Sequence, residues 1–165
     1  MSTGMIIITV ACIAAFIIPF VWASKKKKGF SARVLKSLDK ISKENNAKIS
    51  QSDVYGRSGI AIDETNSLLF FCIYRDFQMN EYVLKIKDIV KCEEFSSSKT
   101  VGEGETQKNV KTREGITFTT TNKQASTVTW EFFNADYDPD FDKHDEMKTI
   151  SKWVEIIGKL INNKK

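Results

Sequence analysis

The sequence predicts an α+β fold, in which an N-terminal transmembrane helix and an amphipathic linker helix precede an antiparallel curved sheet or barrel capped by a C-terminal α-helix. Three observations predict this order. Residues 5–23 form an uncharged apolar run, strand-like alternation prevails between residues 47 and 133, and apolar side chains recur every three or four positions over residues 147–161. Alternation with a period of two is typical of strands, and spacings of three and four are typical of helices.

The length of 165 residues bounds the number of domains. Once an N-terminal segment is set aside, the remainder is long enough for one hydrophobic core and too short for two ordinary ones. We therefore divide the chain into a transmembrane anchor (1–24), a basic juxtamembrane segment with a linker helix (25–46), and a sheet domain with a C-terminal helix (47–165).

The first element is the apolar run, nineteen residues from Met5 to Ala23 without a charge. As a helix it measures about 28 Å, close to the thickness of a hydrocarbon core of about 30 Å. The four residues before it contain no Lys or Arg, whereas a cleaved signal peptide begins with basic residues. We expect a retained span that contacts membrane lipid through residues 5–28. Cleavage after Ala23 and acylation of Cys12 are the alternatives.

The charge is distributed unevenly along the chain. Residues 25–50 hold nine Lys and Arg against two acidic residues, whereas residues 51–165 hold sixteen against nineteen. A basic segment directly after an apolar run favours a cytoplasmic C-terminal domain, with the N-terminus outside, and a contact with anionic lipid rather than with nucleic acid. For the four lysines a plain stop-transfer signal without lipid selectivity is the preferred interpretation, and selective contact with anionic headgroups is the alternative. The predicted membrane-surface residues are Lys25, Lys26, Lys27, Lys28, Arg33 and Lys36.

The linker helix is predicted over residues 30–45. Val34, Leu35, Leu38 and Ile41 are spaced to form one apolar stripe. We expect this stripe to pack against the following domain, or the helix to serve as a spacer; a helix lying on the membrane is the alternative.

After this helix the period changes to two, which predicts a series of short strands separated by turn residues. Asn66-Ser67 and residues 76–80 have turn composition, and the alternation slips by one residue near Asp88, where we expect a bulge or a corner. The predicted strands are 48–52, 59–63, 68–74, 82–86, 89–95, 116–121 and 127–133.

Residues 96–115 interrupt the strand series. They contain three consecutive serines, three glycines and no aromatic residue, so they offer nothing for a core. We expect a mobile loop or an extended hairpin tip, and long loops often carry binding sites.

The C-terminal helix has the clearest pattern. Its apolar stripe includes Ile150, Trp153 and Ile157, and it is expected to begin near Asp142 and to run for about twenty residues. Such a stripe needs an apolar partner, and an open end of the curved sheet is the expected one.

The order of short antiparallel strands and one C-terminal helix resembles the pleckstrin-homology-like (PH-like) superfold, including its bacterial versions and the related GRAM domains. Residues 59–63, residues 82–89 and the helix around Trp153 carry the resemblance. It implies a binding scaffold without a fixed activity. Lipid-binding members of that superfold carry a basic cluster in the first hairpin loop, and the corresponding turn here offers only Arg57.

Enzyme, metal and cofactor sites are not indicated by the sequence. His144 is the only histidine, and the acidic stretch 136–142 has no glycine at the sixth position that a calcium loop requires. These acids are expected to cap the C-terminal helix instead. Cys12, Cys72 and Cys92 have no metal or disulfide spacing, which suits a reducing compartment. We therefore expect no enzyme and no cofactor.

Two classes of function remain. The first is binding of a protein partner at the membrane, through a strand edge or the 96–115 segment; the second is recognition of anionic lipid headgroups. In the predicted strands, Phe71 and Phe133 point to the opposite face of the sheet from the residues beside them. We expect these two side chains to reach the surface. The candidate partner-binding residues are Phe71, Phe133, Lys99, Lys108, Lys111 and Arg113.

Overall fold

The computed structural model describes residues 29–102, 107–122, 126–137 and 143–163. Within these ranges no helix combines the length and apolar content that crossing a bilayer requires. The predicted anchor at 1–24 and the lysines at 25–28 lie outside the described residues.

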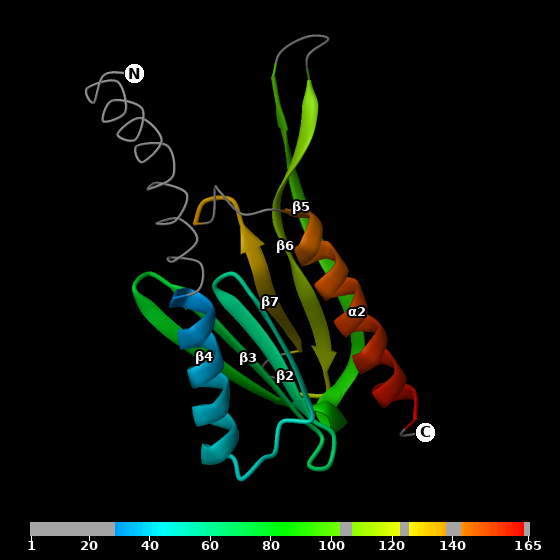
Figure 1. The fold of residues 1–165 in the computed structure, drawn as a ribbon. Helices are drawn as coiled ribbons and strands as arrows, with labels where there is room; N and C mark the ends of the chain where they lie inside the picture. Colours follow the sequence, from blue (N-terminus) through cyan, green and yellow to red (C-terminus); the bar gives the residue numbers. More distant parts are fainter. Residues whose placement is uncertain (1–28, 103–106, 123–125, 138–142, 164–165) are drawn as a thin grey trace, which may run out of the picture.

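The described chain is α+β, as predicted. A helix over residues 29–44 precedes two antiparallel sheets, and a second helix follows them (Figure 1). The bounds after the first helix are β1 (Gln51–Tyr55), β2 (Ser58–Asp63), β3 (Leu68–Arg75), β4 (Gln78–Lys85), the 3-10 turn η1 (Ile86–Asp88), β5 (Ile89–Val101), β6 (Lys108–Thr120), β7 (Thr127–Asn134) and α2 (Lys143–Asn162).

The strands do not form one closed barrel. The first sheet has the order β1-β2-β3-β4 and the second the order β5-β6-β7, so among the described strands β1, β4, β5 and β7 are edges. The corner expected near Asp88 is confirmed: η1 lies between the sheets, and the register shifts between Ile89 and Lys91. The barrel alternative is wrong because this corner turns the chain into a second, separate ladder.

The main core lies between the two sheets and α2. Ile150, Trp153 and Ile157 of α2 are buried in it, as their spacing predicted, against both sheets. The Trp153 indole also donates a hydrogen bond from Nε1 to Asp53 Oδ2 of β1, at 2.8 Å. Helix α2 therefore connects the second sheet to the edge of the first.

A second core lies on the opposite face of the first sheet, where the helix over residues 29–44 packs. Val34, Leu38 and Ile41 are buried there against β2 and β3, which confirms packing on the domain. Leu35, assigned to the same stripe, is 50% exposed because it lies beside the contact face. Gly59 of β2 permits the close approach, since a Cβ there would overlap Val34 Cγ1 and lie 3.0 Å from Leu38 Cδ1.

The largest difference from the predicted strands is the β5–β6 hairpin. Of the two alternatives for residues 96–115, the structure shows the extended hairpin in the described residues: β5 and β6 each have 13 residues and pair from Val101 and Lys108 inward, with register shifts at Ser97/Ser98 and at Ile89/Lys91. We call residues 96–101 and 108–113 the arm. In Figure 1 the arm projects well beyond the body of the protein.

Smaller differences concern strand ends. β1 is shifted toward the C-terminus by three residues relative to 48–52, and β4 begins at Gln78 rather than at residue 82. The early start of β4 follows from a two-residue turn at Asp76 and Phe77, which both have positive φ (52° and 60°). Tight hairpin turns of this kind match the twist of the strands that they join.

Candidate functional site

One end of the body gathers side chains from four separate segments. They come from the start of the first helix, the β1–β2 turn, the β3–β4 hairpin and the segment after β7 (Figure 1). They line a cavity of about 310 Å³. We call this group the Phe77 end, and it consists of Phe30, Arg33, Arg57, Tyr74, Asp76, Phe77 and Tyr137, so that two arginines stand against one acidic residue.

Phe77 is the most unusual residue of this group. It is 93% exposed, more than any other large hydrophobic side chain in the described residues. Its backbone φ of 60° lies in the left-handed region, which bulky residues rarely adopt. Strained backbone of this kind costs about 1–3 kcal/mol and concentrates at functional sites. The protein therefore holds a large apolar side chain in solvent at an energetic cost.

Arginines lie on the aromatic rings around Phe77. The Arg57 guanidinium lies 4.9 Å from the Phe30 ring centre, and the Arg33 guanidinium lies 5.6 Å from that of Tyr74. The Phe30 and Tyr74 rings are themselves in contact at 5.3 Å. Stacking of this kind orients a guanidinium without neutralising its charge. The surface that results is both aromatic and cationic.

The predicted membrane-surface residues are only partly placed. Arg33 belongs to the Phe77 end, whereas Lys36 is exposed and lines a groove of about 620 Å³ beside the same helix. In that groove Ser37 and Lys40 both bind Glu81, whose hydrogen bond and charge raise the pKa of Lys40. The lysines 25–28 lie outside the described residues, directly before the helix that begins at the Phe77 end.

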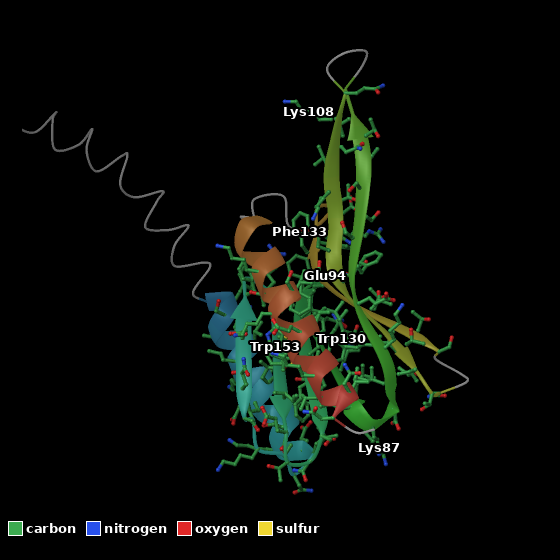
Figure 2. The ribbon with its side chains drawn as sticks, turned by 90° about the vertical axis from the view of Figure 1, so that its right-hand side faces the viewer. Lys87, Glu94, Lys108, Trp130, Phe133 and Trp153 are labelled. Carbon is green, nitrogen blue, oxygen red and sulfur yellow. The ribbon has the colours of Figure 1, made fainter. Side chains whose placement is uncertain are left out.

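The cationic residues assigned to a partner site are spread along the arm. Lys99 and Lys108 are exposed, with Lys108 near its far end in Figure 2. Lys111 and Arg113 lie at its base, where Lys111 Nζ is 2.5 Å from Glu114 Oε1 and Arg113 is 3.5 Å from Glu131. The arm thus brings these four residues onto one hairpin, where Lys99, Lys108 and Arg113 are exposed and Lys111 is half-buried beside Glu114.

Phe71 and Phe133 do not reach the surface, so their expected exposure is wrong. Each is 1% exposed. Phe71 stacks on Trp130 at 5.1 Å between the sheets, and its neighbour Phe70 is buried under the first helix. Both faces of β3 are covered, one by the second sheet and one by the first helix. The side chains of residues 69–73, which alternate between its two faces, are therefore all buried.

The two cysteines in the described part of the chain are shielded from solvent by the surrounding side chains. Burial raises the pKa of Cys72 to about 11 and that of Cys92 to about 12, so both thiols are protonated at neutral pH. No cluster of metal-binding side chains occurs among the described residues. Most of the acidic stretch 136–142, and the side chain of His144, lie outside them.

Sequence reasoning missed Phe30, Phe77 and Tyr137 as surface aromatics. Phe77 lies in the interval 76–80 that was predicted to be a turn, so its exposure was open to inference from its neighbours Asp76 and Gln78. Nothing in the sequence indicates that the other two residues lie beside it.

Comparison of the chain with protein-family models, with curated proteins and with solved structures finds no match in any of the three.

Proposed function

We propose that this protein is a single-pass membrane-anchored binding module whose cytoplasmic PH-like domain rests its Phe77 end on the lipid surface. The observation that carries the proposal is Phe77, a strained and 93% exposed aromatic residue beside the arginines of the same end. Aromatic rings favour the interfacial layer of a bilayer, and each cationic side chain near an anionic leaflet contributes about 1 kcal/mol.

The position of this end in the chain supports the proposal. The described helix begins at residue 29, directly after the four lysines and the apolar run of the predicted anchor. Because Phe30 lies in the first turn of that helix, a span ending near residue 24 leaves only a few residues between the bilayer and the Phe77 end. The PH-like assignment is supported by the succession of a four-stranded sheet, a three-stranded sheet and one C-terminal helix.

The test measures how deep position 77 lies in a bilayer. The full-length chain, with its three cysteines replaced by serine, carries a nitroxide at Phe77→Cys and is placed in nanodiscs of anionic lipid. We expect the label to be more accessible to oxygen than to a water-soluble nickel complex. Lys87→Cys is the matched control, since Lys87 is exposed at the opposite end of the body in Figure 2.

The same measurement also contains the outcome that rejects the proposal. If positions 77 and 87 show the same accessibility to the nickel complex, the Phe77 end faces water and not lipid.

A protein partner bound by the arm is the second candidate. Over residues 108–111, β6 is paired with β5 and with no other described strand, so the arm presents open backbone edges. Val101 and Val110 are 54% and 37% exposed along it. Open edges with exposed apolar side chains are suited to the addition of a partner strand.

The arm is tested with a photo-crosslinking amino acid at Val110 of the full-length chain in its own membranes. We expect one discrete adduct at Val110 and none at the control position Lys87. Equal labelling at both positions, or none at either, rejects the arm as a partner site.

A further inference from the structure

A second cavity, of about 130 Å³, lies where the two sheets fail to join. Its walls are the inner face of β3 and β4 on one side and the edge strand β7 on the other. We call it the seam pocket, and it is lined chiefly by Phe71, Arg75, Tyr82, Thr129, Trp130 and Glu131. Its lining residues belong to neither the Phe77 end nor the arm, although Arg75 contacts Tyr137 of the Phe77 end and Glu131 contacts Arg113 of the arm.

Two hydrogen-bond donors of this pocket are unsatisfied. Trp130 is 1% exposed, and its Nε1 has no hydrogen-bond partner in the described part of the chain. The Nη2 of Arg75 is likewise buried without a partner there. Native proteins rarely leave buried N–H groups unpaired, and each such group calls for an explanation. Two such donors lining one pocket indicate that it accepts a hydrogen-bond acceptor.

Both donors are fixed in position by their neighbours. Arg75 uses its other terminal nitrogen to bind Glu131 Oε2 at 3.0 Å, and its guanidinium lies 4.7 Å from the Tyr137 ring centre. The Trp130 ring is stacked on Phe71 at 5.1 Å and meets the edge of Phe118 at 4.7 Å. Since little freedom remains to be lost on binding, such a site favours a ligand that fits the existing geometry.

The charge of the surroundings selects the kind of acceptor. Arg75 and Arg113 both lie beside Glu131, at 3.0 and 3.5 Å, which leaves one net positive charge among the three. A single negative charge balances it. A carboxylate carries that charge, accepts hydrogen bonds at two oxygens and donates none. The volume corresponds to about four water-sized groups, the number of heavy atoms in acetate.

We propose that the seam pocket binds a carboxylate, with one oxygen accepting from Trp130 Nε1 and the other from Arg75 Nη2. Tyr82 at its rim is 44% exposed, whereas both donor atoms are buried, so a carboxylate reaches them from solvent when the Tyr82 side chain moves aside. The carboxylate belongs either to a small free acid or to an acidic side chain of a peptide. This site is independent of the proposed membrane contact and stands or falls separately from it.

The test follows the indole N–H resonances of the full-length chain, labelled with ¹⁵N-tryptophan in detergent micelles, as sodium acetate is added. We expect the Trp130 resonance to move and to saturate. Trp153 is an internal control, because its indole already donates to Asp53. Sodium chloride at equal ionic strength controls for salt.

Arg75→Gln measures the role of the arginine. We expect acetate to bind this variant at least about tenfold more weakly, the effect of losing a hydrogen bond to a charged group. Lys152→Gln removes a cation that pairs with Asp53, away from the pocket, and should leave the affinity unchanged. Circular dichroism shows that each variant is folded, because Lys152 and Trp153 bind the same Asp53 oxygen and the Trp153 resonance therefore responds to Lys152→Gln itself.

A second titration identifies the source of the carboxylate. It compares an acidic peptide with the same peptide in which the acidic side chains are replaced by amides. A response to acetate alone assigns a small acid, and a response to the acidic but not the amidated peptide assigns a protein side chain. If the Trp130 resonance is unmoved by hundreds of millimolar acetate, moves equally with chloride, or responds identically in Arg75→Gln, the proposal is wrong.

Discussion

Replacing Gly59 with alanine tests how tightly the first helix is held on the sheet. The added Cβ would overlap Val34 Cγ1 and lie 3.0 Å from Leu38 Cδ1, and both of these side chains are fully buried. Overpacking of this kind costs about 1–3 kcal/mol. Releasing the helix would instead expose Val34, Leu38 and Ile41, at about 1.5–3 kcal/mol each. The smaller cost prevails, so we expect the helix to shift outward and remain attached.

Two measurements on the full-length chain follow this change. Urea unfolding should show a loss of about 1–3 kcal/mol. Labelling of Cys72, with Cys12 and Cys92 replaced by serine, reports helix docking, because Cys72 lies buried beneath the helix and its pKa is raised to about 11. We expect labelling to rise slightly. Gly158→Ala is the matched control, because a Cβ there meets nothing within 4 Å.

Two results would refute this reasoning. A change in unfolding free energy below about 0.5 kcal/mol, the usual range for a surface substitution, would mean that the helix does not press on Gly59. Cys72 labelling as fast as that of an unfolded chain would mean that the helix detaches.

Three further predictions concern other contacts. Gly115→Ala should destabilise by about 3 kcal/mol or more in urea unfolding, because its Cβ would collide with the Trp130 backbone oxygen, which cannot move aside; a loss no larger than that of Gly59→Ala contradicts this. Trp153→Phe removes the bond to Asp53 and should lower the unfolding free energy by about 2–4 kcal/mol, whereas Asp53→Asn, which keeps an acceptor, should cost less. The backbone N–H of Asn66 lowers the pKa of Asp63, so Asp63 stabilises the fold above its ordinary pKa of about 4 and loses that contribution as the pH falls through its lower folded value. The stability difference between wild type and Asp63→Asn should therefore be complete at pH 7 and shrink below about pH 4; a difference independent of pH would exclude the carboxylate as its source.

Helices and turns could be predicted where the spacing of apolar side chains is constant along an element and is interrupted by turn residues. The stripe containing Ile150, Trp153 and Ile157 predicted α2 within one residue of its start, and Asn66-Ser67 predicted a turn in which Ser67 has a φ of 54°. In both places the local preference agrees with the final packing, which is the condition under which sequence patterns are reliable.

The arm could not be recognised from side-chain periodicity. Apart from Val101 and Val110 its residues are polar, and none is buried, so the ladder between β5 and β6 is held by backbone hydrogen bonds that every sequence can make. A period of two appears only where one face is buried, and here neither face is.

The exposure of Phe71 was mispredicted because one-sided burial was assumed for β3. Residues 68–73 are a continuous apolar run, which is the pattern of a strand buried on both faces. Combined with the stripe of residues 34–41, that run does predict a helix packed on the outer face. The left-handed backbone of Phe77 was beyond such reasoning, since a bulky residue gives no signal for that conformation, although its place in a turn was predicted.

The docking of the first helix along the sheet has a mechanical consequence. Because the buried side chains Val34, Leu38 and Ile41 contact the sheet in successive turns, a pull at residue 29 along the helix axis loads all three contacts together, in shear, rather than one after another. Movement of the segment before residue 29 is thereby passed directly to the first sheet, against which the helix packs.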